Sequence, residues 1–389
     1  MVQPELQETG PETLPPELNS SPSHATSKSQ TRQAIASKVS ILEHITRDLK
    51  TSQGIKIENH VGFTQVPVGL AGPLTVNGTS QKTKQLYGPL ATVKPTLVAA
   101  CSRGCKLFST CGGISTSALT EGLSRAPVFV FSNIAAAVAF YHLVPSLLED
   151  FKANAQKTSR HAVLLSLSPS IIGSSVHIKF TYSCGDAAGQ NMVTLATHAA
   201  CSAFLSSASR PSDLIDFQLE GNISSDKKLS WGSVHEPRGV SVMAWGTITN
   251  EVSQKILGCS TKRLKTVLAR FGEGDLRNGN LGQCLNTSNI VASMFIACGQ
   301  DAGSMLESGW SQLTAELDSE TGDLTLRYAT QREALELIGC YGEGKKWAFA
   351  ETVAAFALSL EISTLAAIAN DTFAASHKSL ARDAKTSKL

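Results

Sequence analysis

The sequence has few aromatic residues, almost no net charge and no closely spaced CxxC cysteine pair. Aromatic side chains make up 6% of the 389 residues, and 34 Lys and Arg against 32 Asp and Glu leave a net charge of +2. This balance does not indicate the broad basic field with stacking aromatics that is typical of nucleic-acid-binding proteins, so no nucleic-acid partner is expected. The nine cysteines contain no CxxC pair, and no set of His and Cys completes a zinc pattern. We therefore expect reduced thiols and no metal site.

A long apolar run is also missing. The best run, Ile134 to Leu148, is interrupted by His142 and Pro145, whereas a membrane span needs roughly 18–20 apolar residues. The N-terminus has no apolar signal core. We therefore expect neither a membrane span nor secretion. Hydrophobic residues at 42% and charged residues at 17% are typical of a globular protein, and the length allows two domains.

Composition divides the chain into parts. Residues 1–33 are rich in Ser, Thr, Pro, Gln and Glu, which predicts a disordered tail. Apolar residues at helical spacing predict a small helical segment over residues 34–57. We expect an α+β fold for the rest. It consists of a large, mainly helical domain over residues 58–126 and 220–389, with a module of residues 127–219 inserted into it.

The inserted module has the clearest pattern. Apolar and alternating runs predict strands, and longer apolar stretches rich in small residues predict helices. A turn over Pro169–Ser175 separates the second strand from the third. The resulting order, β-α-β-β-α-β, is typical of a ferredoxin-like module. The expected elements are Pro127–Phe131, Ile134–Ala155, His161–Ser168, Val176–Ser183, Asp186–Ser207 and Leu214–Leu219.

Longer elements follow the module. Gly239–Thr249 reads as a strand, and Asn250–Arg270 and Asn286–Leu306 read as helices. Trp347–Ala375 is a long stretch of Ala, Leu and Ser that is too uniformly apolar for a surface helix. The sequence therefore predicts a long buried central helix near the C-terminus.

Two polar patterns could carry chemistry in loops. Gly185–Asn191 lies between a strand and a helix, where backbone N–H groups can hold a pyrophosphate, although an ordinary N-cap at Asp186 explains the same residues. Ser225–Lys228 is a polar loop in which a lysine near a carboxylate can stabilise a developing oxyanion. A solvated charged loop is the alternative interpretation.

Two further patterns follow apolar helical stretches. Cys298–Asp301 ends one of them, and a buried Asp301 must be paired, so a structural salt bridge and a catalytic role are both open. Ser376-His377 follows the long helix, where a histidine can donate a proton near neutral pH. An exposed histidine without a role is the alternative.

Taken in order, the four patterns resemble the catalytic portion of hydroxymethylglutaryl-CoA reductases of the eukaryotic class. The resemblance covers most of residues 34–380. Because so many separate motifs occur in one order, the chain is identified as a member of this family. The other matching motifs are Glu58–Phe63, Pro67–Pro73, Leu97–Ala99, Arg103–Cys105, Gly112-Gly113, Ser159-Arg160, Asn289–Val291 and Ile296–Cys298.

The resemblance implies reduction of hydroxymethylglutaryl-CoA by NADPH to mevalonate and CoA, which supplies isoprenoid precursors. Lys227 would hold the carbonyl oxygen as negative charge develops, Asp301 would tune that lysine, and His377 would protonate the departing CoA thiolate. The implied binding residues are Ser159, Arg160, Asp186, Gly189 and Asn191 for NADPH, and Arg103, Lys106 and Asn289 for the acyl-CoA substrate. The family also implies a homodimer or homotetramer with shared active sites.

Several positions depart from the family pattern. The catalytic glutamate of the family is Lys94, the arginine that clamps the substrate carboxylate is Val130, and a substrate-binding serine is Glu220. A family histidine is replaced by Asn286, and residues 326–331 stand where a glycine-rich cofactor segment is expected. These departures predict poor turnover of the usual substrate, or a changed one. The alternative function is a catalytically impaired relative that binds CoA or NADPH or serves as a regulatory subunit.

Two further expectations concern Lys94 and the C-terminus. Lys94 beside Lys227 would place two cations in one site and depress the pKa of one of them. We keep Lys94 among the candidate catalytic residues because an ammonium group can donate a proton. The final residues, Ser387-Lys388-Leu389, match the peroxisomal address, so we expect a peroxisomal location, with the cytoplasm as the alternative.

Overall fold

The computed structural model describes residues 57–80, 83–187, 189–236, 238–280, 282, 284–332 and 344–373. The predicted tail, the helical segment before Ile57, His377 and the C-terminal tripeptide lie outside these residues. The chain divides into two compact units, Met1–Val66 and Pro67–Leu389. In the described part of the first unit, the rings of His60 and Phe63 pack edge to face with centroids 5.1 Å apart.

The second unit contains strands and helices throughout its described length. The strands are β1 (Val68–Gly78), β2 (Lys84–Ala91), β3 (Ile114–Arg125), β4 (Val128–Phe131), β5 (Val163–Ile172), β6 (Ser175–Ser183), β7 (Leu214–Gln218), β8 (Gly239–Ile248), β9 (Ser311–Leu317) and β10 (Leu324–Arg332). The helices are α3 (Leu97–Thr110), α4 (Ile134–Leu143), α5 (Leu148–Gln156), α6 (Gln190–Leu205), α7 (Trp231–His235), α8 (Asn250–Leu257), α9 (Thr261–Asn278), α10 (Thr287–Ala297), α11 (Met305–Ser308) and α12 (Lys346–Ala369), with 3-10 turns η2 (Val144–Leu147) and η3 (Ala302–Ser304). The predicted α+β class is confirmed.

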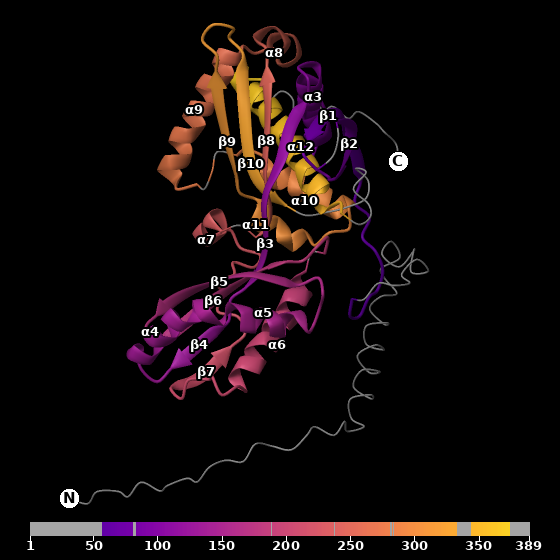
Figure 1. Ribbon diagram of the computed structural model, residues 1–389. Coiled ribbons are helices and arrows are strands. Elements are labelled where there is room, and N and C mark those ends of the chain that lie inside the picture. The colour runs from indigo at the N-terminus through magenta and orange to yellow at the C-terminus, as the bar shows by residue number, and fades with distance from the viewer. Residues whose placement is uncertain are drawn as a thin grey trace, which may run out of the picture. The chain divides into compact units, whose positions relative to one another are not determined.

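The sheet is continuous through β3 (Figure 1). Its main path runs β7-β4-β6-β3-β8-β10-β9, and the neighbours along this path are antiparallel. β3 pairs with β8 over residues 115–122 and with β6 over residues 123–125. Strand β3 therefore connects the strands of the inserted module, which was predicted to begin after residue 126, to the strands of the rest of the chain.

Residues 128–218 have their own core. Strand β5 pairs with β6, so the four strands lie in the order β7-β4-β6-β5, all antiparallel. Helices α4, α5 and α6 pack on them, and Asn133 caps α4 by accepting a hydrogen bond from Ala136 N. Buried aromatic rings fill the space between these strands and helices, so several of the few aromatic residues of the chain lie together in this core. The central ones are Phe129, Phe140, Phe151, Phe180 and Phe204.

The core of the remaining residues forms around α12. Gly104 of α3 lies so close to α12 that a Cβ there would be 1.8 Å from Ser359 O. Glu351 is fully buried in α12, and its carboxylate accepts hydrogen bonds from Thr79 N and Ala118 N. The expectation of a mainly helical part is incomplete, because six strands (β1, β2, β3, β8, β9 and β10) share this core with the helices.

Within the described residues, two helical stretches are long and apolar enough to cross a membrane by length and composition alone, which leaves the expectation of no membrane span open. They are Ile134–Gln156 and Lys346–Ala369, and within an apolar 18-residue window of each, 28% and 89% of the residues are buried. Burial explains the second stretch as the core helix α12. The first is divided by η2 into α4 and α5, which pack on the sheet of residues 128–218.

Glycines correct three predicted boundaries. The helix predicted over Asn250–Arg270 is two helices, because Gly258 ends α8 with φ +70°. The helix predicted over Asn286–Leu306 stops at Ala297, followed by Gly299 at φ +67°. The predicted turn at Pro169–Ser175 shrinks to residues 173 and 174, where Gly173 adopts φ +61° and β5 continues to Ile172. Glycine tolerates these left-handed conformations, which end regular elements.

Candidate active site

Lys227 and Asp301 form an ion pair with partly exposed side chains. Lys227 Nζ lies 2.7 Å from Asp301 Oδ2, and the side chains are 47% and 53% exposed. Asp301 also accepts a hydrogen bond from Gly303 N over 2.9 Å, because it caps η3. The Asp301 hydrogen bond raises the pKa of Lys227, and the same contact lowers the pKa of Asp301. A charged ammonium group is thus held in place and remains accessible to a ligand.

The backbone of Lys227 is held from a second side. Lys227 adopts φ +54°, an uncommon conformation for a residue with a side chain. Its N–H donates to Glu307 Oε1 over 2.6 Å, and Glu307 forms an ion pair with Arg238. Burial raises the pKa of Glu307 although Arg238 opposes the shift. Since strained backbone persists where its surroundings fix it, the pair explains how the loop keeps this conformation.

Arg238 connects this loop to other elements. Its side chain is 1% exposed and pairs with Asp226 over 2.8 Å. It also donates to Ser124 O at the end of β3 and to Gln190 Oε1 at the start of α6. Burial alone would raise the pKa of Asp226, but the guanidinium groups of Arg238 and Arg125 lower it. The buried arginine therefore ties the lysine loop to the helix that was predicted to bind the cofactor.

Glu220 is not an isolated negative charge. It lies 3.4 Å from Arg125 Nη1, and its carboxylate accepts from Asn222 N over 2.7 Å. Arg125 also pairs with Asp226 over 2.8 Å. The negative charge of Glu220 is therefore partly balanced by Arg125.

Sequence reasoning missed the three residues that hold the lysine loop, Arg125, Arg238 and Glu307. Each is remote in sequence from at least one partner, so no local spacing reveals the cluster. A usable signal existed for Arg238, because it precedes Gly239 at the start of a strand with apolar residues on alternate positions. A charged residue adjoining such a buried strand needs a buried partner.

The predicted cofactor loop is partly used by the protein itself. The Asp186 carboxylate accepts hydrogen bonds from Gly344 N over 2.5 Å and Lys346 N over 3.2 Å, at the start of α12. In this structure Asp186 contacts the start of α12, whose N-terminal amides attract a carboxylate, and its assignment to NADPH stays a prediction. Gly189 precedes α6 with φ +73°, and a Cβ there would lie 2.6 Å from Cys184 Sγ. Glycine is required at that position by both strain and space.

The other predicted NADPH residues lie at two places. Ser159 accepts a hydrogen bond from His161 N, and Arg160 Nε donates to His161 Nε2 over 3.1 Å, just before β5. Asn191 is exposed in the first turn of α6. Among the described residues no group of three or more His, Cys, Asp or Glu is arranged to hold a metal ion.

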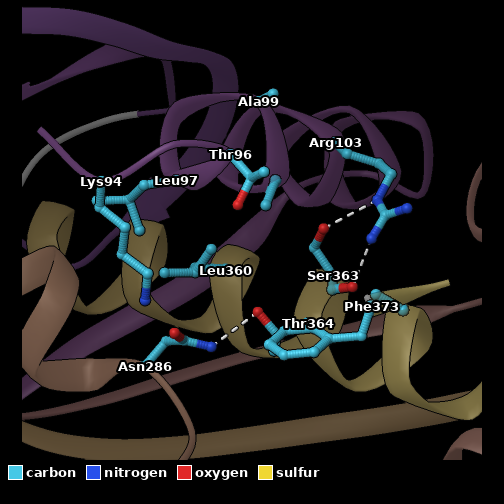
Figure 2. Close-up of a pocket in the computed structure, with 12 residues that line it drawn as sticks. Lys94, Thr96, Leu97, Ala99, Arg103, Asn286, Leu360, Ser363, Thr364 and Phe373 are labelled. Atoms are coloured by element: carbon cyan, nitrogen blue, oxygen red, sulfur yellow. Dashed lines mark hydrogen bonds between the residues drawn. The ribbon is translucent and has the colours of Figure 1, made fainter. Parts of the chain in front are cut away.

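A pocket is lined by one predicted substrate residue, Arg103, and by two positions that depart from the family pattern, Lys94 and Asn286 (Figure 2). Asn286 donates to Thr364 Oγ1 over 2.7 Å and accepts from Asn289 Nδ2 over 2.8 Å. Lys106 is exposed on α3 and does not line the pocket. The lining residues are Lys94, Thr96, Leu97, Ala99, Ala100, Arg103, Asn286, Leu360, Ser363, Thr364, Ala367 and Phe373.

The pocket wall is fixed by a buried carboxylate that the sequence analysis overlooked. Glu361 of α12 is fully buried and accepts from Leu285 N over 2.8 Å and Asn286 N over 2.6 Å. Burial raises the pKa of Glu361 to about 7, although these hydrogen bonds oppose the shift. An acid within an apolar helix is itself a signal of a buried hydrogen-bonded role.

Lys94 and Lys227 occupy different surroundings. Lys94 lines the pocket with Arg103, and Lys227 is not among the residues that line it. The pKa of Lys227 is raised by Asp301 and not depressed, so the expected depression does not fall on this lysine.

Two other departures have structural places of their own. Val130 lies in β4 between β6 and β7 and outside the pocket. Residues 326–331 belong to β10, which pairs with β8 and β9 on its two sides. This segment is an inner strand of the sheet and not a cofactor loop.

Comparisons with known proteins give one consistent result. The family model described as "Hydroxymethylglutaryl-coenzyme A reductase" matches residues 26–382. The 3-hydroxy-3-methylglutaryl-coenzyme A reductase of Haloferax volcanii is 34% identical, covering 84% of this chain and 85% of its own length. The corresponding reductase of Methanocaldococcus jannaschii is 31% identical, with 90% of this chain and 92% of its own covered. Reductase 1 of Hevea brasiliensis is 32% identical over 87% of this chain and 62% of its own.

Solved structures agree at the level of the fold. A 3-hydroxy-3-methylglutaryl-coenzyme A reductase from Streptococcus pneumoniae superposes with a TM-score of 0.61 at 15% identity, covering 90% of this chain and 85% of that one. A class II reductase from the same organism, bound to NADPH in open conformations, has a TM-score of 0.59 at 16% identity, covering 89% of this chain and 95% of that one. At such identities the likeness concerns the fold alone.

Proposed function

Because this chain belongs to the hydroxymethylglutaryl-coenzyme A reductase family, whose members are oxidoreductases, we propose that it reduces an acyl-CoA thioester with NADPH. Hydroxymethylglutaryl-CoA is the proposed substrate, and two successive hydride transfers, one from each of two NADPH, take its thioester through the aldehyde to mevalonate with release of CoA. The observation that carries the proposal is the Lys227–Asp301 pair, an accessible ammonium group held 2.7 Å from its carboxylate. The relatives from Haloferax volcanii and Methanocaldococcus jannaschii carry the same reductase name.

Lys227 is the group that acts on the thioester. When hydride adds to the carbonyl carbon, negative charge develops on the oxygen, and a fixed ammonium group stabilises that charge most at the transition state. Asp301 keeps Lys227 protonated and oriented, since it raises the pKa of the lysine. By resemblance, His377 protonates the departing CoA thiolate.

The start of α6 fits an anionic cofactor group. Gly189 allows close backbone approach, and among the described residues no acidic side chain occupies the first turn and no side chain caps it. The positive end of the helix dipole favours a phosphate at such a place. Arg160 and Ser159 would hold the 2′-phosphate that distinguishes NADPH. When bound, NADPH supplies the hydride. We interpret residues 127–219 as an inserted ferredoxin-like module that binds it.

The direct test uses purified full chain with NADPH and hydroxymethylglutaryl-CoA. Loss of absorbance at 340 nm, together with mevalonate identified by mass spectrometry, supports the proposal. NADPH oxidation without mevalonate formation, or with a different thioester preferred, contradicts the proposed substrate. A panel of acyl-CoA thioesters then identifies the acyl group.

A second candidate function is supported by the composition of the pocket. Lys94 stands in place of the catalytic glutamate, and none of the residues that line the pocket is acidic. In this second proposal the chain binds CoA or NADPH without turnover and regulates an active reductase. Tight NADPH binding by calorimetry with no oxidation favours it, and restoration of turnover by Lys94→Glu would identify the missing acid as the cause.

Assembly and location remain proposals. A homodimer or homotetramer with shared active sites is expected from the family, and analytical ultracentrifugation measures its mass. We propose a peroxisomal location because Ser387-Lys388-Leu389 matches the peroxisomal address, and the cytoplasm is the alternative location. A fluorescent protein carrying the last twelve residues, with and without the final three, tests this by microscopy.

A further inference from the structure

A separate pocket lies between α5 and α6, the two helices that pack against each other on the sheet of residues 128–218 (Figure 1). It is formed by the beginning of α5 and the end of α6. Its volume is about 110 Å³. A water molecule needs about 10–15 Å³ of such space, so a small organic molecule of several heavy atoms has room.

The pocket has a negative charge without a matching cation. Among the described residues that line it, Asp150 alone is charged, and its carboxylate forms no ion pair or hydrogen bond within the described part of the chain. Two other polar side chains of the lining already have partners. Asn154 Nδ2 donates to Asp150 O over 2.8 Å, and Ser207 Oγ donates to Phe204 O over 2.8 Å. The Asp150 carboxylate is therefore the polar group available to a ligand.

The helix ends beside the pocket oppose each other electrostatically. The end of α6 bears partial negative charge, and the start of α5 bears partial positive charge. Glu149 and Asp150 lie in the first turn of α5 and counter its positive end. Lys157 reaches the edge of the pocket, where its Nζ donates to Asn154 Oδ1 over 2.8 Å without pairing with Asp150. Asp150 therefore sets the sign of the charge that a ligand meets.

The inner wall of the pocket is apolar. Phe151 and Phe204 are buried, and their ring centroids lie 5.4 Å apart. Leu147 and Ala200, also buried, add hydrocarbon surface. A ligand that satisfies both the wall and the carboxylate has an apolar body with a cationic end, and an ammonium group near aromatic rings gains a cation–π attraction as well. An anion would meet Asp150 with like charge.

We propose that this pocket binds a primary ammonium group carried on a short aliphatic chain, with the Asp150 carboxylate as its counter-ion. The ammonium group belongs either to a free alkyl amine or to the lysine side chain of another protein. The site is separate from the proposed reduction, because neither Lys227 nor Asp301 lines the pocket. The pocket lies at the end of α6, and the proposed cofactor site lies at its start, 16 residues or about 24 Å along the helix.

The test measures binding and needs no turnover. Pentylammonium is titrated into the full chain at low salt and followed by ligand-detected NMR, in parallel with its neutral isostere 1-pentanol. We expect saturable pentylammonium binding, at least tenfold weaker binding of pentanol, and at least tenfold weaker pentylammonium binding by Asp150→Asn. Glu149→Gln is the matched control, because Glu149 lies in the same first turn of α5 but does not line the pocket. It should bind pentylammonium like the unmodified chain.

A second variant and a competition complete the test. Ala203→Leu fills the pocket from α6 and leaves α5 unchanged, so it should also abolish pentylammonium binding. If the methylamide of Nα-acetyl-lysine displaces pentylammonium, the pocket takes a lysine side chain, and if it does not, the pocket takes a free amine. Either result supports the ammonium site. Equal binding of pentanol, unchanged binding by Asp150→Asn or Ala203→Leu, or no saturable binding of pentylammonium overturns it. Because these titrations contain neither NADPH nor a thioester, their failure is separate from a failure of the proposed reduction.

Discussion

Glu307 receives both the backbone N–H of Lys227 and the guanidinium group of Arg238. This arrangement connects a buried ion pair to Lys227, the residue that we propose acts on the substrate. Arg238 has a second carboxylate partner, Asp226, at 2.8 Å. The position of Lys227 thus depends on the charges of Glu307, Arg238 and Asp226.

Removing one partner of the buried Arg238–Glu307 ion pair should strongly lower the stability of the protein. Arg238→Met leaves Glu307 buried without its cation, and we expect the free energy of unfolding to fall by about 3–5 kcal/mol. Glu307→Gln keeps the shape and should cost less, about 1–3 kcal/mol. Urea denaturation of both single variants and of the double variant measures their coupling. If the losses in unfolding free energy of the two single variants add up in the double variant, the two side chains do not act together. Arg238→Lys replaces Arg238→Met in this measurement if the Met variant fails to fold.

Lys227 and Asp301 should control the rate more than substrate binding. We expect Lys227→Met to lower kcat about 10²–10³-fold with a smaller change in KM, because the ammonium meets most charge at the transition state. Asp301→Asn should also lower kcat and should move the pKa of Lys227 down, since Asp301 raises it. Steady-state NADPH oxidation gives both constants. Lys255→Met, at an exposed lysine of α8, is the control and should keep the rate of the unmodified chain. A Lys227→Met variant with unchanged kcat would refute the assigned role.

Glu361 should make stability depend on pH. Its folded pKa of about 7 lies above the ordinary glutamate pKa of 4.5, so its contribution to stability is fully present below pH 4.5 and is lost as pH rises through about 7. Relative to Glu361→Gln, the unmodified chain should therefore lose about 3 kcal/mol of unfolding free energy between pH 4.5 and pH 8. Denaturant unfolding of both proteins across this range gives the difference. Glu273→Gln, at an exposed glutamate of α9, should show no such trend. A constant difference for Glu361→Gln would contradict the burial of a titrating acid.

Gly104 should tolerate no side chain. A Cβ there would lie 1.8 Å from Ser359 O, so Gly104→Ala must push α3 and α12 apart. We expect a loss of about 1–3 kcal/mol or more in unfolding free energy. Gly274→Ala lies in α9 with nothing within 4 Å of the added Cβ, and it should stabilise the protein by up to about 1 kcal/mol. Thermal unfolding of the two variants should therefore move in opposite directions.

Hydrophobic patterns along the sequence correctly predicted individual strands and helices that bury one or more faces in a core. The alternation of Val176, Ile178 and Phe180 predicted β6, and the uniform apolar composition predicted the long helix found as α12. Boundaries failed where a glycine was read as part of a helix, as at Gly258 and Gly299, whose positive φ ends α8 and follows α10. These two glycines carried the missing signal.

The pairing of the site was less accessible to sequence reasoning. The motif order of a known family, rather than spacing, brought Lys227 and Asp301 together, and the structure places them in contact. No local sequence pattern joins Arg238 to Glu307, which are 69 residues apart, because their contact depends on the tertiary fold. The contact of Asp186 with the start of α12, 160 residues away at Lys346, was invisible for the same reason.

The double membership of β3 limits how this protein can be taken apart. A fragment that begins at residue 126 would deprive β6 of its partners at residues 123–125, and one that ends there would leave those residues of β3 unpaired, so either has open backbone groups along an edge. Unpaired strand edges recruit other chains, so such fragments should aggregate. Domain exchange between relatives would accordingly have to replace β3 together with its neighbours β6 and β8, because a graft that ends at residue 126 separates residues 123–125 from β6.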